Sequence, residues 1–188
     1  GPRRFPDSRG YFAETWTRRG FAEAGIDVAF VQDNYSRSRS IGTIRGLHYQ
    51  RPPKAQAKLV RVSRGAIFDV AVDLRRGSPS FGKHVSVNLS ADEGSQLFLP
   101  AGFAHGFCTL EPDTEVAYKI SEFYSPEHDT GILWNDPDLG IEWPLEGRIP
   151  VMPLGRKASS EPLSSEDMAL LAAVAPQAAT ALENGRLY

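Results

Sequence analysis

A histidine and a lysine ten residues apart give this chain its clearest candidates for acid–base chemistry. His48 lies in the run Ile44–Gln50, and Lys58 opens the apolar run Lys58–Val62. A histidine exchanges protons near neutral pH, and a lysine can stabilise negative charge that develops on a substrate oxygen. A lone histidine is also common on an exposed edge strand. The segment around His48 therefore permits both a functional and a purely structural interpretation.

The run Ile44–Gln50 is predicted to be a strand, in which alternate side chains face opposite sides. This pattern places Arg45 with Leu47 on one face and His48 with Gln50 on the other. The face of His48 then carries no bulky apolar residue, as expected of a wall that meets a ligand. Arg45 and Lys58 add a local group of cations that suits an anionic substrate.

Metal binding is a second chemistry to consider at this histidine. A metal site in a small β-barrel needs converging ligands, such as a His-x-His pair with a carboxylate, whereas His48 is followed by Tyr49 and Gln50. The ammonium group of Lys58 would also repel a divalent cation. The sequence therefore predicts no metal and no other cofactor.

Bulk properties narrow the class of protein further. The chain has 188 residues, which suits one domain with a tail, and 41% hydrophobic with 23% charged residues are ordinary for a globular protein. A net charge of -2 argues against nucleic-acid binding, and no apolar run approaches the roughly 20 residues of a membrane-spanning helix. The single cysteine, Cys108, excludes an internal disulfide. We therefore expect a cytoplasmic protein without nucleic-acid or membrane partners.

Short strand candidates follow one another closely, and no long helix separates them. They cover residues 28–35, 44–50, 58–62, 66–74, 84–89, 95–99, 107–110 and 114–120. This spacing predicts an all-β barrel or sandwich. Asp69 and Asp73 fall on one face of the fourth candidate, where burial would require partners. His105 is expected at the start of the seventh strand.

Residues 151–188 differ from the rest and are predicted to be an extension with an amphipathic helix. Ser164 is a suitable N-cap, and Pro176 should kink or split the helix. Such a helix would dock on the sheet or on a partner subunit. The predicted division is therefore a domain of residues 1–150 and an extension of residues 151–188.

Several segments together resemble the dTDP-4-dehydrorhamnose 3,5-epimerase family of cupins. The matching segments are Asp7–Gly10, Phe30–Ser36, Arg45–Gln50, Lys58–Val62, Phe68–Arg75, Ser78–Gly82, Pro100–Phe107 and Trp134–Asp136. The resemblance implies a cupin jelly-roll barrel that works as a homodimer without metal. The expected fold is therefore all-β, with short peripheral helices and the C-terminal helix added to this barrel. It also implies an isomerase of deoxysugar biosynthesis, such as that of rhamnose, which inverts C3 and C5 of a dTDP-4-keto-6-deoxyhexose.

The resemblance also implies roles for individual residues. His48 corresponds to the general base, Tyr118 to the general acid and Lys58 to the group that stabilises the enolate. Asp69 and His105 correspond to paired groups of the pocket wall. The implied substrate-binding positions, of which the first reach across the dimer, are Arg9, Phe12, Glu14, Gln32, Asn34, Arg45 and Tyr124.

Two departures from the family pattern keep alternatives open. Few residues precede Asp7, where the family has a further β segment, so we expect a truncated N-terminus. Aligning the family's Leu-Ser-x-Lys-Asp motif with residues 154–158 puts Ala158 where an aspartate should orient the base. The alternatives are an epimerase acting at C3 alone or C5 alone, and a sugar-nucleotide-binding cupin with weakened catalysis.

Overall fold

The computed structural model describes residues 1–145, so the predicted C-terminal helix and the extension of residues 151–188 lie outside this part. The strands and the short helix have the following bounds: β1 Arg4–Asp7, β2 Gly10–Ala13, α1 Arg18–Glu23, β3 Gln32–Ser38, β4 Ile44–Gln50, β5 Lys58–Arg64, β6 Ala66–Asp73, β7 Arg76–Gly77, β8 His84–Ser90, β9 Gln96–Leu99, β10 Phe103–Thr109, β11 Thr114–Ile120 and β12 Asp129–Gly131. None of the helices in residues 1–145 is long and apolar enough to cross a membrane.

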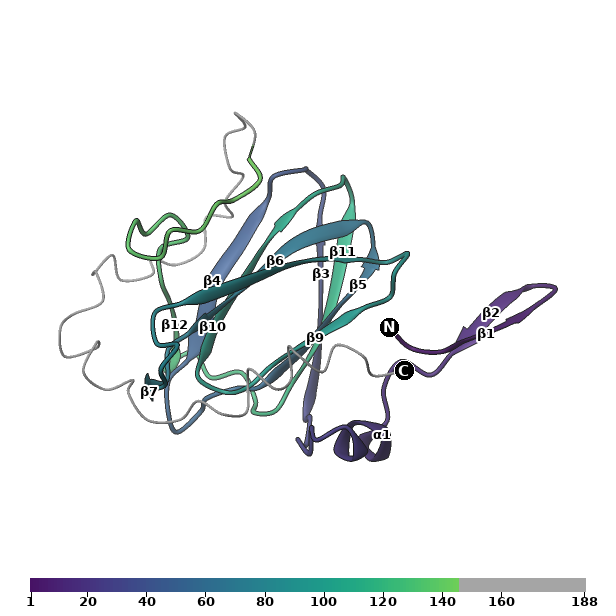
Figure 1. Ribbon diagram of the computed structural model, residues 1–188, viewed down its shortest axis with the longest axis horizontal. Helices are drawn as coiled ribbons and strands as arrows, with labels where there is room; N and C mark the ends of the chain where they lie inside the picture. The colour runs from purple at the N-terminus through teal and green to yellow at the C-terminus, as the bar shows by residue number, and fades with distance from the viewer. Residues whose placement is uncertain (146–188) are drawn as a thin grey trace.

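Two antiparallel sheets form the body of the protein (Figure 1). One sheet has the order β12-β4-β10-β6-β8, and the other has the order β3-β11-β5-β9. They face each other as the two layers of a jelly-roll barrel, which confirms the predicted all-β cupin class. Strands β1 and β2 pair with each other, and their hairpin projects away from the barrel (Figure 1).

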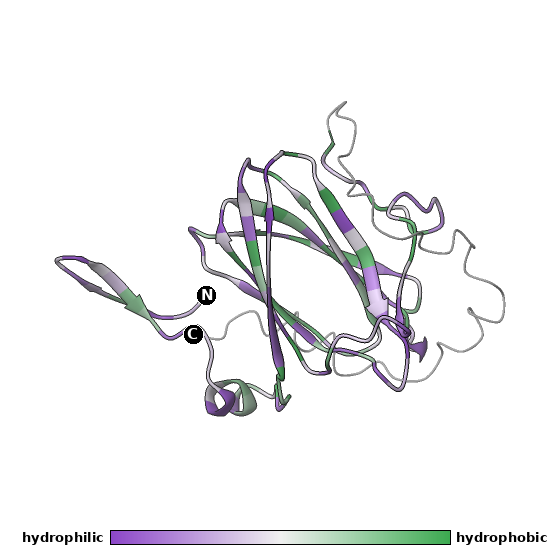
Figure 2. Ribbon diagram, turned by 180° about the vertical axis from the view of Figure 1, so that it is seen from behind, coloured by the Kyte–Doolittle hydropathy of each residue, from purple (hydrophilic) through white to green (hydrophobic). Residues whose placement is uncertain are grey.

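Strand β6 shows how the sequence alternation builds two apolar layers. Ile67 and Ala71 join the cluster between the sheets, whereas Val70 and Val72 pack on the outer face against the segment of residues 132–143. Hydrophobic and hydrophilic residues accordingly alternate along the barrel strands (Figure 2). The face of β6 that points between the sheets is the one that carries Asp69.

The two aspartates of β6 are both buried and both partnered, as predicted. Asp73 is 2% exposed and accepts hydrogen bonds from the side chains of Arg75, Ser78 and Ser80. These bonds lower the pKa of Asp73 to about 2 against the opposing effect of burial, which is the largest single influence. Asp69 binds His105 instead and belongs to the candidate site.

Some element bounds differ from those predicted. The strand carrying His105 begins at Phe103, so this histidine lies inside β10 and the predicted strand start is wrong. Pairing explains the difference, because Phe103 lies opposite Asp73 of β6 and extends the ladder toward Gly102. Strand β3 also lies later than predicted, since it pairs along its whole length with β11.

Candidate active site

A β-bulge in β4 brings Arg45 and His48 to the same side of the sheet. Phe107 of β10 lies opposite Arg45, and His105 of β10 lies opposite His48. Between these two pairs β10 has one residue, whereas β4 has two. The extra residue reverses the alternation of faces. Leu47 therefore packs in the outer cluster, whereas Arg45 reaches β3 and donates to the Ser38 hydroxyl at 2.9 Å. The predicted sharing of one face by Arg45 and Leu47 is wrong.

Two glycines allow the close approach of β4 and β10 at this bulge. Gly46 has a φ of 132°, and a Cβ atom there would lie 2.4 Å from the Cα of Gly106. A Cβ atom on Gly106 would lie 2.8 Å from the carbonyl oxygen of Arg45. Any larger residue would have to move backbone on one strand or the other. The bulge therefore depends on glycine at both positions.

Lys58 opens β5 and lies against the backbone of the His48 strand. Its side chain is 8% exposed, and its ammonium group donates to the carbonyl oxygen of His48 at 3.3 Å. Burial lowers the pKa of Lys58 to about 8, although the negative charges of Asp129 and Asp69 oppose that shift. With a pKa only slightly above neutral pH, the lysine keeps its proton but can share it with an oxyanion in a hydrogen bond.

His48 remains exposed to solvent while neighbouring atoms replace part of its water shell. This desolvation lowers the pKa of His48, and the positive charge of Lys58 lowers it further. The imidazole is therefore neutral at neutral pH and can accept a proton, as a general base must.

Tyr118 approaches from the opposite sheet. It lies on β11 and packs against the apolar cluster between the sheets. Burial raises the pKa of the Tyr118 phenol, so the group keeps its proton at neutral pH and can donate it. The charges of Arg45 and Asp129 act on both Tyr118 and His48. Tyr118 and His48 therefore lie near the same charged groups, although they belong to different sheets.

Asp69 and His105 form a buried pair on neighbouring strands. The Nε2 atom of His105 lies 2.9 Å and 3.1 Å from the two carboxylate oxygens of Asp69, and the two residues are 7% and 0% exposed. His105 is also the register partner of His48 across β4 and β10. The resemblance implies paired groups at these two positions, and the structure pairs them; their role in a pocket wall stays a prediction.

Gln32 and Asn34 lie on β3, next to Tyr118. Their side chains are joined by a hydrogen bond of 2.8 Å, and Asn34 is the register partner of Tyr118. The side-chain amide oxygen of Gln32 accepts a hydrogen bond from the backbone N–H of Tyr124 at 3.3 Å. Structure thus brings these three predicted substrate-binding positions to the edge of the same site.

Three further predicted positions lie elsewhere in the protomer. Arg9 is in the turn of the β1–β2 hairpin, where its guanidinium group binds Asp7 at 2.6 Å. Phe12 lies on β2 and is 69% exposed, and Glu14 lines a hollow near α1. Figure 1 shows the hairpin pointing away from the barrel, so one protomer does not bring Arg9 or Phe12 to His48.

Asp129 is a residue of the site that the sequence analysis missed. It lies on β12, opposite Gln50 of β4, and accepts from the Tyr124 hydroxyl at 3.4 Å. Its negative charge raises the pKa values of His48, Lys58 and Tyr118. No sequence signal marks it, because a strand of three residues is too short to show alternation.

No group of three or more histidine, cysteine, aspartate or glutamate residues that could hold a metal ion occurs in residues 1–145. A hollow of about 610 Å³ lies away from His48, between the N-terminal segment with α1 and strands β8 and β9. Its lining contains Arg3 and Glu14 but no histidine, lysine or tyrosine. It therefore offers no acid–base pair, and the proton-transfer chemistry is assigned to the barrel.

The fold and the site define a cupin jelly-roll barrel that carries a histidine on β4, a lysine on β5 and a tyrosine on β11. These side chains suit an isomerase that works by proton transfer. A sequence profile of the dTDP-4-dehydrorhamnose 3,5-epimerase family matches residues 1–172. The chain belongs to this family.

Individual relatives agree with that assignment. The dTDP-4-dehydrorhamnose 3,5-epimerase of Sinorhizobium fredii is 54% identical over 161 residues, which cover 86% of this chain and 81% of the relative. The crystal structure of the Bacillus anthracis epimerase with TDP and PPi bound has a TM-score of 0.78 at 48% identity and covers 90% of this chain and 89% of that one. The Legionella pneumophila epimerase in complex with dTDP-4-keto-L-rhamnose has a TM-score of 0.77 at 45% identity, with 81% and 80% covered.

Proposed function

We propose that this protein inverts C3 and C5 of a dTDP-4-keto-6-deoxyhexose, with His48 as the base and Tyr118 as the acid. The observation that carries the proposal is the placement of His48 and Tyr118 on opposite sheets, where the charges of Arg45 and Asp129 act on both. The buried ammonium group of Lys58 lies against the same strand and donates to the backbone carbonyl oxygen of His48 at 3.3 Å. The substrate class follows from relatives such as the Legionella pneumophila enzyme with its bound dTDP-4-keto sugar.

The proposed chemistry requires one group on each face of the sugar. The C4 ketone acidifies the hydrogens on C3 and C5, because the electron pair left behind delocalises onto O4. His48 removes the proton as the C–H bond breaks and the enolate forms. Lys58 and Arg45 stabilise the charge on O4. Tyr118 then returns a proton to the opposite face of the same carbon, which inverts its configuration.

Solvent exchange tests this assignment. The substrate is incubated with the protein in deuterated water, and C3 and C5 are followed by NMR. Deuterium at both positions is expected, and label at one position alone would instead indicate a single-site epimerase. His48→Ala should reduce exchange by roughly 10²–10⁴-fold while nucleotide affinity persists. Exchange at the wild-type rate in His48→Ala would eliminate this residue as the base.

We further propose that the nucleotide is held partly by the hairpin of a second protomer. Arg9 and Phe12 are exposed on the projecting hairpin, and an exposed arginine with an aromatic ring suits a diphosphate and a nucleobase. A homodimer would bring these groups to the partner's barrel. Light scattering should then give twice the chain mass.

Mixed dimers provide the sharper test of a shared site. His48→Ala and Phe12→Ala are each impaired, but a dimer of one with the other contains one site without either change. A random mixture should therefore regain about a quarter of the wild-type sites, because about half of the dimers are mixed. A mixture no more active than its components would show that each site is built by a single chain.

The residue that orients His48 is also open to a test. Ala158 and the rest of residues 146–188 lie outside the described part. The family match, however, continues to residue 172 and includes the run Leu163–Asp167, which has the Leu-Ser-x-x-Asp spacing. We propose Asp167 for this role, since its run begins with the motif's Leu-Ser pair and the run ending at Ala158 does not. Asp167→Asn should slow exchange, whereas Ala158→Ser should not.

The other expectations about partners and place remain predictions. They are a cytoplasmic location and the absence of nucleic-acid and membrane partners. The alternatives of a single-site epimerase and of a binding module with weakened catalysis are not favoured, because relatives at about half identity are 3,5-epimerases.

A further inference from the structure

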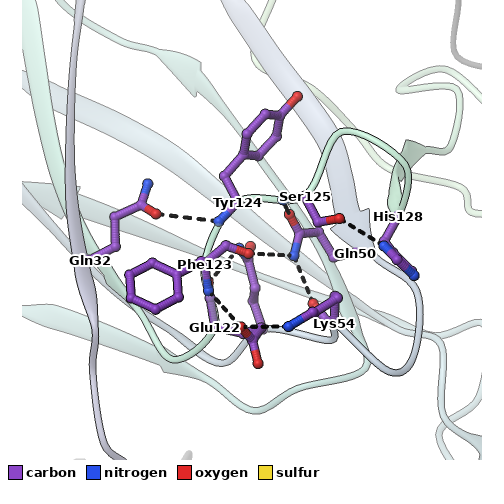
Figure 3. A network of polar contacts seen from close by, with 9 residues as sticks. Gln32, Gln50, Lys54, Glu122, Phe123, Tyr124, Ser125 and His128 are labelled. Carbon is purple, nitrogen blue, oxygen red and sulfur yellow. Dashed lines mark hydrogen bonds and ion pairs between the residues drawn. The ribbon is translucent and has the colours of Figure 1, made fainter.

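The loop between β11 and β12 carries Tyr124, and a buried amide on the His48 strand holds its backbone (Figure 3). Gln50 lies two residues after His48 and is 4% exposed. Its Nε2 atom donates to the carbonyl oxygens of Lys54 at 2.7 Å and Phe123 at 3.2 Å, and its Oε1 atom accepts from the N–H of Ser125 at 2.7 Å. One carboxamide therefore binds backbone groups on both sides of Tyr124.

Other polar contacts hold the start of this loop and share its centre with Gln50. Gln56 donates to the carbonyl oxygen of Glu122 at 2.9 Å, which holds the start of the loop. At the centre, the Tyr124 N–H donates to the side-chain amide oxygen of Gln32 at 3.3 Å, which is a longer bond than the 2.7 Å bond from the Ser125 N–H to Gln50. Figure 3 shows Gln50 between the loop and Lys54, with the Tyr124 ring pointing away from the network.

The backbone matters here because the aromatic side chains of the loop are not packed into a core. Phe123 is 61% exposed and Tyr124 is 57% exposed. The position of an exposed ring follows the backbone that carries it. The Tyr124 hydroxyl lies 3.4 Å from a carboxylate oxygen of Asp129, whose charge acts on His48. A displaced loop would therefore move Tyr124 relative to the proton-transfer groups.

We propose that Gln50 is a positioning residue that fixes the loop backbone around Tyr124 and thereby sets the place of this ring for substrate binding. The inference rests on the proposed function and on the substrate contact that the family resemblance implies for Tyr124. Gln50 itself does not touch the reacting atoms. Its loss should therefore weaken substrate binding more than it slows proton transfer.

The experiment compares Gln50→Met with Gln56→Met in the full chain. Both changes replace a carboxamide by a thioether of similar length, but only the first removes the bonds around Tyr124. Chymotrypsin cleavage after Phe123 and Tyr124, followed by mass spectrometry, reports how often the loop opens. We expect about tenfold faster cleavage in Gln50→Met, from the cost of leaving buried backbone groups unpaired. Gln56→Met should give a clearly smaller increase, because its bond lies at the start of the loop and not around Tyr124.

Steady-state kinetics provides the second reading. We expect KM to rise about tenfold in Gln50→Met while kcat stays within about twofold, because the lost interaction acts on binding. Gln56→Met should keep both constants. Melting temperatures of the two variants separate a local effect on the loop from a general loss of folding.

A second variant, Gln50→Glu, keeps the test decisive if Gln50→Met folds poorly. When the introduced carboxyl group is protonated, it can donate to the Lys54 carbonyl and accept from the Ser125 N–H, as the amide does. When ionised, it would repel the carbonyl oxygens. Its KM, measured relative to wild type at each pH, should therefore fall toward the wild-type value as the pH is lowered, whereas Gln50→Met should show no such recovery.

Two results would overturn the inference. Unchanged cleavage in both Gln50 variants would mean that the amide does not hold the loop, and faster cleavage with unchanged KM would mean that the loop does not position a substrate contact. The cleavage assay needs no substrate. If the wild-type protein exchanges no deuterium, the proposed function fails, while the cleavage rates still decide whether Gln50 holds the loop.

Discussion

The barrel interior and the β1–β2 hairpin carry functional residues in opposite ways. In the barrel, strand pairing fixes each side chain, so His48 and His105 are register partners and Asn34 lies beside Tyr118. The hairpin pairs only with itself in the described part of the chain, and its Phe12 is 69% exposed. The groups proposed for proton transfer thus lie where strand pairing fixes them, and the groups proposed for the nucleotide lie on a hairpin outside the barrel.

The largest expected effect is on the stability of the barrel interior, compared with the barrel surface. Asp69→Ala would leave His105 buried without its carboxylate, so we expect unfolding free energy to fall by about 3–5 kcal/mol. Chemical denaturation measures this loss. The matched control is Asp33→Ala, since Asp33 is 70% exposed and pairs with Lys119 at 2.9 Å on the surface. Its loss should be about 1 kcal/mol or less. Similar losses in both variants would contradict the buried pair.

The glycine contact at the bulge comes next in size. Gly46→Ala should destabilise the protein by about 1–3 kcal/mol more than Gly25→Ala, because the added methyl group must push two strands apart. Gly25 is a fair control, since its φ of 86° is also positive while nothing lies within 4 Å of an added Cβ atom. Thermal melting compares the two variants. Equal shifts would show that β4 and β10 can separate there without cost.

Changes in the hairpin should affect binding but not the stability of the barrel. Phe12→Ala removes a ring that is 69% exposed, so the free energy of unfolding of the protomer should change by about 0.5 kcal/mol or less. We expect KM to rise, because the proposed contact of Phe12 with the nucleobase is lost, while deuterium exchange at saturating substrate persists. Arg3→Ala on the same N-terminal segment is the control for a general disturbance. A lower kcat with unchanged KM would contradict the division between the two regions.

The smallest expected effect is electrostatic and confined to the barrel. Asp129 raises the pKa values of both His48 and Lys58. Asp129→Asn removes that charge, so both pKa values should fall and both limbs of the pH profile of kcat/KM should move to lower pH. The shift should shrink with added salt because Asp129 is exposed. A change in only one limb would show that Asp129 does not act on both groups.

Much of the barrel could be predicted from the chain alone, because short alternating strands separated by turn residues signal themselves locally. Residues 114–120 and residues 66–74 are predicted as strands, and they form β11 and, over residues 66–73, β6. Strand ends were less predictable. The start of β10 depends on its partner strand β6, and pairing between distant segments is not visible in a window of sequence.

The sequence by itself determined the ionisable groups and the family. His48, Lys58 and Tyr118 stand at spacings that resemble the family, and the match over residues 1–172 bears this out. Only the tertiary structure decided how the groups face. The bulge at Gly46 turned Arg45 toward His48, the three-residue strand β12 brought in Asp129, and the hairpin held Phe12 away. The chemical type of each side chain is a property of its residue. The direction of a side chain and its distance from other groups depend on pairing between segments far apart in the chain.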